Sequence, residues 1–111
     1  MAFYEPEDLK AESIGAGRSR VAVHTDGIMM VIFDFDDGPA KEPDPLHSHP
    51  HEQISYVASG RVIYFLGNEQ KTLEAGDMVT IAPNVPHAIQ TLTSKVRLVD
   101  AFSPVREDFL S

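Results

Sequence analysis

The sequence contains neither cysteine nor tryptophan. Without cysteine the chain cannot form a disulfide, a zinc–thiolate centre or a thiol nucleophile, so any metal ion must be held by histidine, carboxylate or amide groups. Long apolar runs are also missing, and none approaches the roughly 18 residues that a membrane-spanning helix needs. The first residues are acidic before any apolar run begins, which is the wrong charge for a secretion signal. We therefore expect a soluble, cytoplasmic protein.

The chain is also poor in basic residues. Nine Lys and Arg stand against 17 Asp and Glu, which gives a net charge of −8 with neutral histidines. No local cluster of Lys and Arg offsets this acidic excess. Phosphate backbones and anionic lipid carry the same sign of charge and would be repelled. The composition therefore argues against nucleic acid and membrane surfaces as partners.

Short segments rich in Val, Ile, Phe and Tyr recur along the chain, separated by turn formers such as Asp26-Gly27 and Ser59-Gly60. The expected strands are 21–25, 28–35, 53–58, 61–66, 71–73, 78–81, 88–92 and 96–102. Only residues 5–12 look helical, and they allow a turn or two at most. A chain of 111 residues buries one core. We therefore expect a single all-β domain over residues 1–111, a small antiparallel β-barrel of the jelly-roll type.

Three of the five histidines lie in residues 47–53, which read His-Ser-His-Pro-His-Glu-Gln. In an extended strand alternate side chains share a face, so His47 and His49 can direct two ring nitrogens to one point. His87 follows a Pro-x-x-Pro turn and would approach from a distant strand. This pattern indicates a metal site rather than a surface decorated with histidine.

The remaining residues of this region are less determined. Alternation alone would place both His51 and Gln53 on the inner face, but Pro50 interrupts regular pairing and leaves the choice between them open. His24 stands apart from the cluster, and we expect it to be unrelated to the site.

The C-terminal strand carries an acid among apolar residues. Asp100 shares one face of segment 96–103 with Leu98 and Phe102. If that face is the interior, the buried carboxylate needs a partner or a cation and is a candidate acid or base; otherwise it is an exposed edge residue. Pro104 ends the strand, after which Arg106 either folds back over the barrel mouth or remains a solvated tail charge.

Several of these motifs resemble those of the cupins, small β-barrels that hold a divalent metal. The matching residues are His47-x-His49 with Gln53, Tyr56-Val57-x-x-Gly60, and Gly76-Asp77 with Pro83-x-x-Pro86-His87. Many cupins have glutamate where this chain has Gln53. A neutral ligand set leaves the charge of the cation uncompensated, which favours a Lewis-acid role on a carboxylate substrate over dioxygen chemistry at iron.

A longer match resembles the KdgF family and spans nearly the whole chain. Its most distinctive part is the C-terminal run Asp100-x-Phe102-Ser103-Pro104-x-Arg106-Glu107-Asp108-Phe109. The resemblance implies conversion of 4,5-unsaturated uronate monosaccharides, released from pectin and alginate, into open-chain keto sugars. Carried over by position, the metal ligands would be His47, His49, Gln53 and His87, and the catalytic residues Asp100, Phe102 and Arg106.

The same resemblance sets further expectations. One divalent ion, nickel, zinc, manganese or iron, would sit in a barrel core at about residues 40–103, with segment 104–111 over the mouth. The substrate would be a small anionic sugar, 4,5-unsaturated galacturonate or 4-deoxy-hex-4-enopyranuronate, and the protein a homodimer. Two other functions stay open at this point, a cupin dioxygenase and a non-catalytic sugar-binding cupin.

Overall fold

The computed structural model describes residues 2–110, so Met1 and Ser111 lie outside the described residues. The elements in chain order are η1 (Pro6–Asp8), β1 (Glu12–Gly15), β2 (Arg18–His24), β3 (Met29–Phe35), β4 (Glu52–Ser59), β5 (Arg61–Leu66), β6 (Glu69–Glu74), β7 (Met78–Ile81), β8 (His87–Thr91), β9 (Val96–Ser103) and η2 (Glu107–Phe109). Strands β2 to β9 match the eight expected segments with small shifts at their ends.

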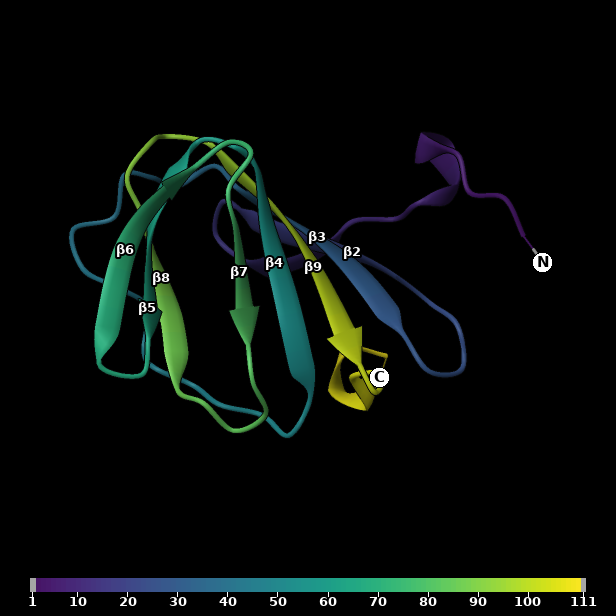
Figure 1. Ribbon diagram of the computed structural model, residues 1–111. Coiled ribbons are helices and arrows are strands. Elements are labelled where there is room, and N and C mark those ends of the chain that lie inside the picture. Colours follow the sequence, from purple (N-terminus) through teal and green to yellow (C-terminus); the bar gives the residue numbers. More distant parts are fainter. Residues whose placement is uncertain (1, 111) are drawn as a thin grey trace.

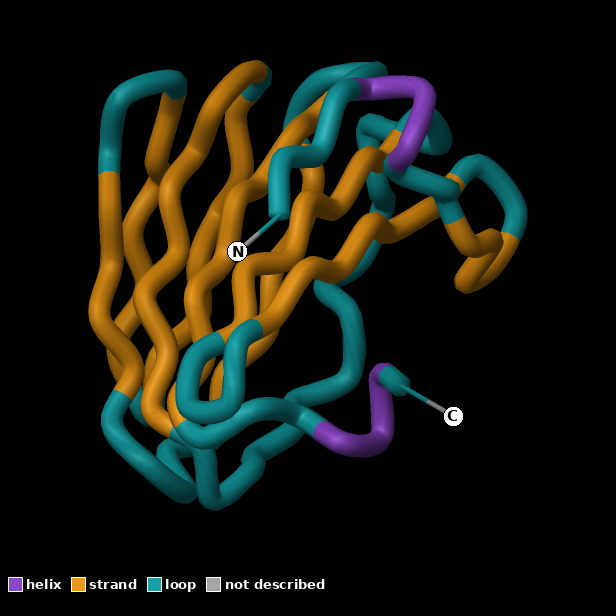
Figure 2. The backbone as a smooth tube through the Cα atoms, turned by 90° about the vertical axis from the view of Figure 1, so that its right-hand side faces the viewer, coloured by secondary structure: helices purple, strands orange, loops and turns teal. Residues whose placement is uncertain are grey.

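These strands form two antiparallel sheets that face each other (Figure 1). The larger sheet has the order β1-β2-β3-β9-β4-β7, and the smaller has the order β6-β5-β8. In Figure 2 both short 3-10 helices lie outside the strands. The expectation of an all-β antiparallel barrel of the jelly-roll type is confirmed.

Strand β1 and the short helix η2 are the elements among residues 2–110 that the sequence pattern did not predict. Strand β1 pairs with the start of β2 in an antiparallel ladder, and Arg20 Nη2 lies 2.7 Å from Glu12 Oε1 across it. All four β1 residues are exposed, so the segment lacks the apolar alternation that marks a half-buried strand. The expected helical turn at residues 5–12 is present as η1.

Strand β9 lies near the middle of the larger sheet and settles which of its faces is inside. Its residues alternate between buried and less buried, and Leu98, Asp100 and Phe102 are each 3% exposed or less. Asp100 pairs with Val31 on β3 and with Ser55 on β4. The carboxylate of Asp100 therefore points into the barrel. Of the two alternatives that the sequence left open, an interior acid and an exposed edge residue, the structure shows the first.

The apolar core fills one end of the barrel. Its members include Phe35, Val57, Leu98 and Tyr64, contributed by both sheets. The other end is lined by polar residues, and only a small cluster built on Met29, Val31 and Phe102 packs there. The two sheets thus leave a polar interior at one end. Among residues 2–110, no helix reaches the length and hydropathy of a membrane-crossing segment.

Candidate metal centre and cavity

Three histidines converge at the polar end of the barrel. Ring nitrogens of His47, His49 and His87 all lie within 4.8 Å of one another. The loop before β4 makes this possible because it runs beside β8, bonded through Ala40 N and Asp44 N to main-chain oxygens of that strand. His47 and His87 themselves exchange two main-chain hydrogen bonds of 3.0 and 2.9 Å. Residues forty positions apart are thereby held side by side.

The hydrogen bonds of two rings fix which nitrogen is free. Nδ1 of His87 lies 2.8 Å from the carbonyl oxygen of Val85, which only accepts, so Nδ1 carries the proton and Nε2 keeps its lone pair. That Nε2 is buried and has no hydrogen-bond partner among the described residues. Nδ1 of His49 donates in the same way to the carbonyl of His51, at 3.0 Å. Backbone carbonyls orient metal-binding histidines in this manner.

Gln53 adds a fourth candidate ligand beside the three histidines, an amide oxygen. Its Nε2 donates to Asp100 Oδ2 at 2.9 Å, which turns Oε1 towards His49 Nε2, also at 2.9 Å. With Nδ1 of His49 protonated, two lone pairs face each other across this short distance and repel. A divalent cation would remove the repulsion and satisfy the orphaned His87 nitrogen as well. The residues present therefore fit a metal ion bound by three imidazoles and one amide oxygen.

The ionisation of the histidines agrees with this fit. Burial lowers the pKa of His87 to about 4, and it lowers the pKa of His47 as well. Both rings are therefore neutral at physiological pH, which is the form that binds a metal ion. His51 does not belong to the converging group.

We expect alanine variants to distinguish the residues that bind the metal ion from residues that only lie near it. His87→Ala removes a nitrogen that has no other partner, so the protein should lose stoichiometric binding of zinc or nickel. His51→Ala, a change of the same size beside the site, should keep it. The measurement is metal content after loading and desalting, with circular dichroism to verify the fold. Retention of one ion per chain by His87→Ala, or its loss in His51→Ala, would contradict this ligand set.

Asp100 lies beside Gln53 and is almost completely buried, with 3% of its surface exposed. Ser55 Oγ donates to its Oδ1 at 2.6 Å and Gln53 Nε2 to its Oδ2. Burial raises the pKa of Asp100 to about 7, while these hydrogen bonds and the charge of Arg106 lower it by less. In the metal-free protein the carboxyl therefore keeps its proton to a much higher pH than an exposed aspartate does. A bound divalent cation would lower this pKa again.

The raised pKa of Asp100 predicts a pH-dependent stability in the metal-free protein. From its ordinary value of 3.8 up to about 7, the folded state retains a proton that the unfolded state has lost, so stability falls as pH rises through this window. The difference corresponds to about 4 kcal/mol at most. In chelator, Asp100→Asn should therefore gain unfolding free energy relative to wild type between about pH 4 and pH 8, measured by urea denaturation. Parallel pH profiles would contradict this. The lowered pKa values of the histidines change stability with pH in the opposite direction, but this contribution is common to wild type and Asp100→Asn and cancels when the two are compared.

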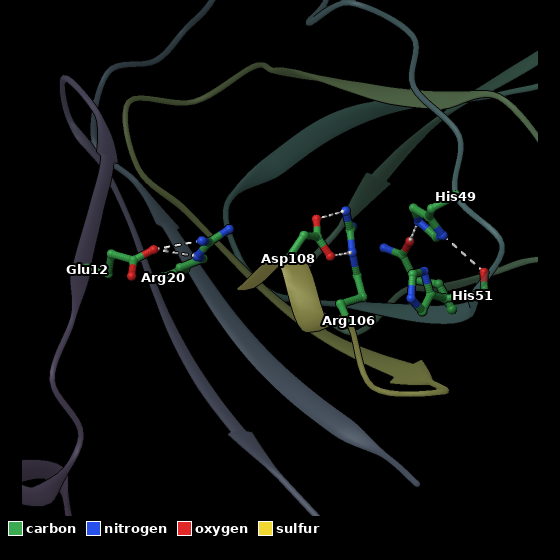
Figure 3. Close-up of polar contacts among 7 residues, drawn as sticks. Glu12, Arg20, His49, His51, Arg106 and Asp108 are labelled. Carbon is green, nitrogen blue, oxygen red and sulfur yellow. Dashed lines mark hydrogen bonds and ion pairs between the residues drawn. The ribbon is translucent and has the colours of Figure 1, made fainter. Parts of the chain in front are cut away.

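The C-terminal segment returns Arg106 to this end of the barrel. The side chain of Arg106 is only 14% exposed, and its Nη2 and Nε donate to Asp108 at 2.8 and 3.3 Å. Its guanidinium carbon lies 4.0 Å from the ring centroid of Phe109 and 5.2 Å from that of Phe102. Arg20 contacts the same Phe109 ring at 4.1 Å. In Figure 3 the Arg106–Asp108 pair lies between the Glu12–Arg20 pair and His49 with His51.

A cavity of about 270 Å³ joins these groups. His47, His87, Gln53, Asp100, Phe102 and Arg106 all line it. It lies near the lower limit of about 300 Å³ for small-molecule pockets, so it suits a small molecule rather than a polymer. Every residue expected at the site except the buried His49 thus lines this one cavity. His24, which is exposed and whose Nδ1 bonds to the carbonyl oxygen of Thr25, does not line it.

Sequence reasoning missed two residues that support this site. Ser55 could have been found, because it lies two positions after Gln53 on the same strand face and pairs with Asp100. Asp108 stands in the C-terminal run, but no periodicity in that tail could show that its carboxylate would bind Arg106.

Comparisons with known proteins agree with the geometry. The family model described as Cupin domain matches residues 33–102. The chain is 32% identical over 110 residues to the pectin degradation protein KdgF of Dickeya dadantii strain 3937, and the match covers 97% of each protein. Among solved structures, an RmlC-like cupin from Shewanella frigidimarina is 35% identical with a TM-score of 0.87, covering 98% of this chain and 96% of that one. KdgF from a Halomonas species is 28% identical with the same TM-score, covering 97% and 99%. The chain therefore belongs to the cupins and, among them, to the KdgF family.

Proposed function

We propose that this protein opens the ring of 4,5-unsaturated uronate monosaccharides formed when pectin or alginate is broken down. The observation that carries the proposal is the buried Asp100 in the same cavity as the three-histidine cluster and Arg106. A carboxylate at this place gives the site a proton acceptor, which mere sugar binding would not need. The relative from Dickeya dadantii, named a pectin degradation protein, supports the substrate class.

Each residue has a role that follows from its position. A divalent cation held by the three histidines and Gln53 would supply positive charge beside the sugar carboxylate and stabilise negative charge developing near C5. Arg106 binds the carboxylate or a ring hydroxyl through the edge of its guanidinium that Asp108 does not occupy. Phe102, 2% exposed, packs against the sugar face and excludes water.

Asp100 moves the proton. Its ionised carboxylate accepts the proton of the anomeric hydroxyl as the C1–O5 bond breaks, which forms an aldehyde at C1. The electron pair of that bond passes to the enolate over O5, C5 and C4. Asp100 then returns the proton to C4, and a ketone remains at C5. A second route has the same product: Asp100 protonates C4, water adds at C5, the hemiketal opens to the C5 ketone, and the hydrate left at C1 loses water to give the aldehyde.

The test is direct. Purified protein loaded with a divalent ion is incubated with a 4,5-unsaturated monouronate while the ultraviolet absorption of the double bond is followed. We expect faster loss of absorption than without protein, with several divalent ions and without oxygen. Activity with iron alone, together with oxygen consumption, would instead identify a dioxygenase. Binding of the sugar without any change in absorption would identify a non-catalytic sugar-binding protein.

We also expect a homodimer formed through the outer face of the larger sheet. Met30, Ile54 and Met78 are about half exposed or more there. Strand register makes the patch continuous: Met30 and Ile54 both flank Ala101, and Tyr56 pairs with Met78. Contiguous exposed apolar patches on soluble proteins are typical of interfaces. Light scattering should give twice the chain mass for wild type and the monomer mass for Ile54→Glu; a monomeric wild type would contradict the dimer.

A further inference from the structure

The cavity has a second polar end, formed by residues with no part in the proposed chemistry. Arg18 on β2 and Asp44 on the loop before β4 both line it. Arg18 Nη1 donates to Asp44 Oδ2 at 2.8 Å, and Arg18 Nε donates to Asp37 Oδ2 at 3.0 Å. The guanidinium carbon lies 5.0 Å from the centre of the Phe35 ring. The arginine is therefore held by two carboxylates and an aromatic ring at a place where it lines the cavity.

We propose that Arg18 and Asp44 form a hydroxyl-binding subsite that holds the sugar ring at the end remote from its carboxylate. Because it names how the substrate is held, this inference rests on the proposed function. The bonds described above use Nε, Nη1 and Oδ2, and no other hydrogen bond joins Nη2 of Arg18 or Oδ1 of Asp44 to any of residues 2–110. These two atoms are a donor beside an acceptor, and a sugar hydroxyl both accepts and donates.

Charge separates the two ends of the cavity. Arg18 with Asp37 and Asp44 sums to −1, so this end does not attract a carboxylate. The histidine end, which has Arg106 and would hold a divalent cation, does attract a carboxylate. A uronate therefore enters with its carboxylate towards the histidines and its hydroxyls towards Arg18, and a second carboxylate at the Arg18 end is disfavoured.

The wall between the ends suits the body of a sugar ring. Phe33, Phe35 and Leu98 line it with apolar surface. In strand register, Arg18 is opposite Phe35 and Phe35 is opposite Val96, four residues from Asp100 along β9. Four residues of strand span about 13 Å, part of which the long arginine side chain covers. One ring fits between the two polar ends in a cavity of about 270 Å³.

A purely structural role for the Arg18–Asp44 pair makes a different prediction. The pair also joins β2 to the loop that carries His47, so its loss could disturb the metal ligands instead of a hydroxyl contact. Asp37 provides the matched control, because its carboxylate binds the same guanidinium but does not line the cavity.

The experiment uses two ligands and requires no turnover. Zinc-loaded wild type, Arg18→Met, Asp44→Ala and Asp37→Ala are titrated by NMR with galacturonate and with tetrahydropyran-2-carboxylate, which has the ring and carboxylate but no hydroxyls. We expect Arg18→Met and Asp44→Ala to weaken galacturonate binding by about tenfold or more, as for lost hydrogen bonds to charged groups. Binding of the hydroxyl-free ligand should change less than about twofold, and Asp37→Ala should weaken galacturonate binding much less than either of the other two variants.

Other results of these titrations would refute the proposed hydroxyl-binding subsite. Equal weakening of both ligands in Asp44→Ala would show that the pair only supports the metal end. Unchanged galacturonate binding in both Arg18→Met and Asp44→Ala, or no galacturonate binding by wild type, would exclude a hydroxyl contact. Because the double-bond assay on wild type tests the reaction separately, an inactive wild type that still discriminates the two ligands would refute the proposed function and leave the subsite intact.

Discussion

Asp100→Asn is expected to keep metal and sugar binding while losing turnover by about two to four orders of magnitude, the range for general acid–base groups. Asparagine has the same shape and can still accept a hydrogen bond from Ser55, but it cannot take up a proton. The loss should appear in kcat rather than in KM, because Asp100 lies behind Gln53 and is not needed to hold the carboxylate. The measurement is double-bond loss under saturating and limiting substrate.

The same Asp100→Asn preparation provides the control, through its metal content and its affinity for galacturonate. Ser55→Ala is a useful partner variant, because it removes the 2.6 Å hydrogen bond to the carboxylate but leaves the carboxylate itself. It should be impaired less than Asp100→Asn. Near wild-type turnover in Asp100→Asn with metal bound would refute the proton-transfer role, and loss of metal would mean that Asp100 only holds Gln53 in place.

Much of this arrangement could be read from the sequence because it depends on local periodicity. The placement of Asp100 follows from strand alternation once one face of β9 is buried. His47 and His49 converge as expected, but they do so in the loop before β4, where His47 forms a single bridge to His87, and not on a regular strand. Turn residues such as Ser59-Gly60 mark strand ends reliably, since glycine accepts the positive φ of 81° found at Gly60.

The rest depends on contacts between distant segments. The choice of Gln53 over His51 as the inward residue comes from β4 pairing with β7 and β9, which Pro50 hides from a pattern-based reading. The hydrogen bond between Arg18 and Asp44 joins residues 26 positions apart, and nothing in either neighbourhood distinguishes it from ordinary surface charge. Strand β1 forms through pairing with β2, not through its own composition.

Arg106→Ala is expected to reduce kcat/KM by about ten- to a hundredfold, mainly through a higher KM, as for loss of charged hydrogen bonds to a carboxylate. In an acidic protein of charge −8, Arg106 supplies local positive charge beside the metal site. Arg106→Lys should remain markedly impaired, because an ammonium group cannot bond to Asp108 and to the sugar with the planar geometry of a guanidinium. Steady-state kinetics with the unsaturated monouronate measure both variants.

Asp108 and Phe109 contact Arg106, and a change at Phe109 can show whether this arginine binds the sugar or only lies near it. Both hold Arg106 in place, through the 2.8 Å ion pair and the 4.0 Å contact with the ring. If Arg106 binds the sugar carboxylate, Phe109→Ala should raise KM in the same direction as Arg106→Ala but by less, and Phe109→Tyr, which keeps the ring, should restore it. Changing Phe109 in the Arg106→Ala background should then add little, because the group that it positions is gone. Full activity of Arg106→Ala would instead class this arginine with the solvated charges of the C-terminal segment.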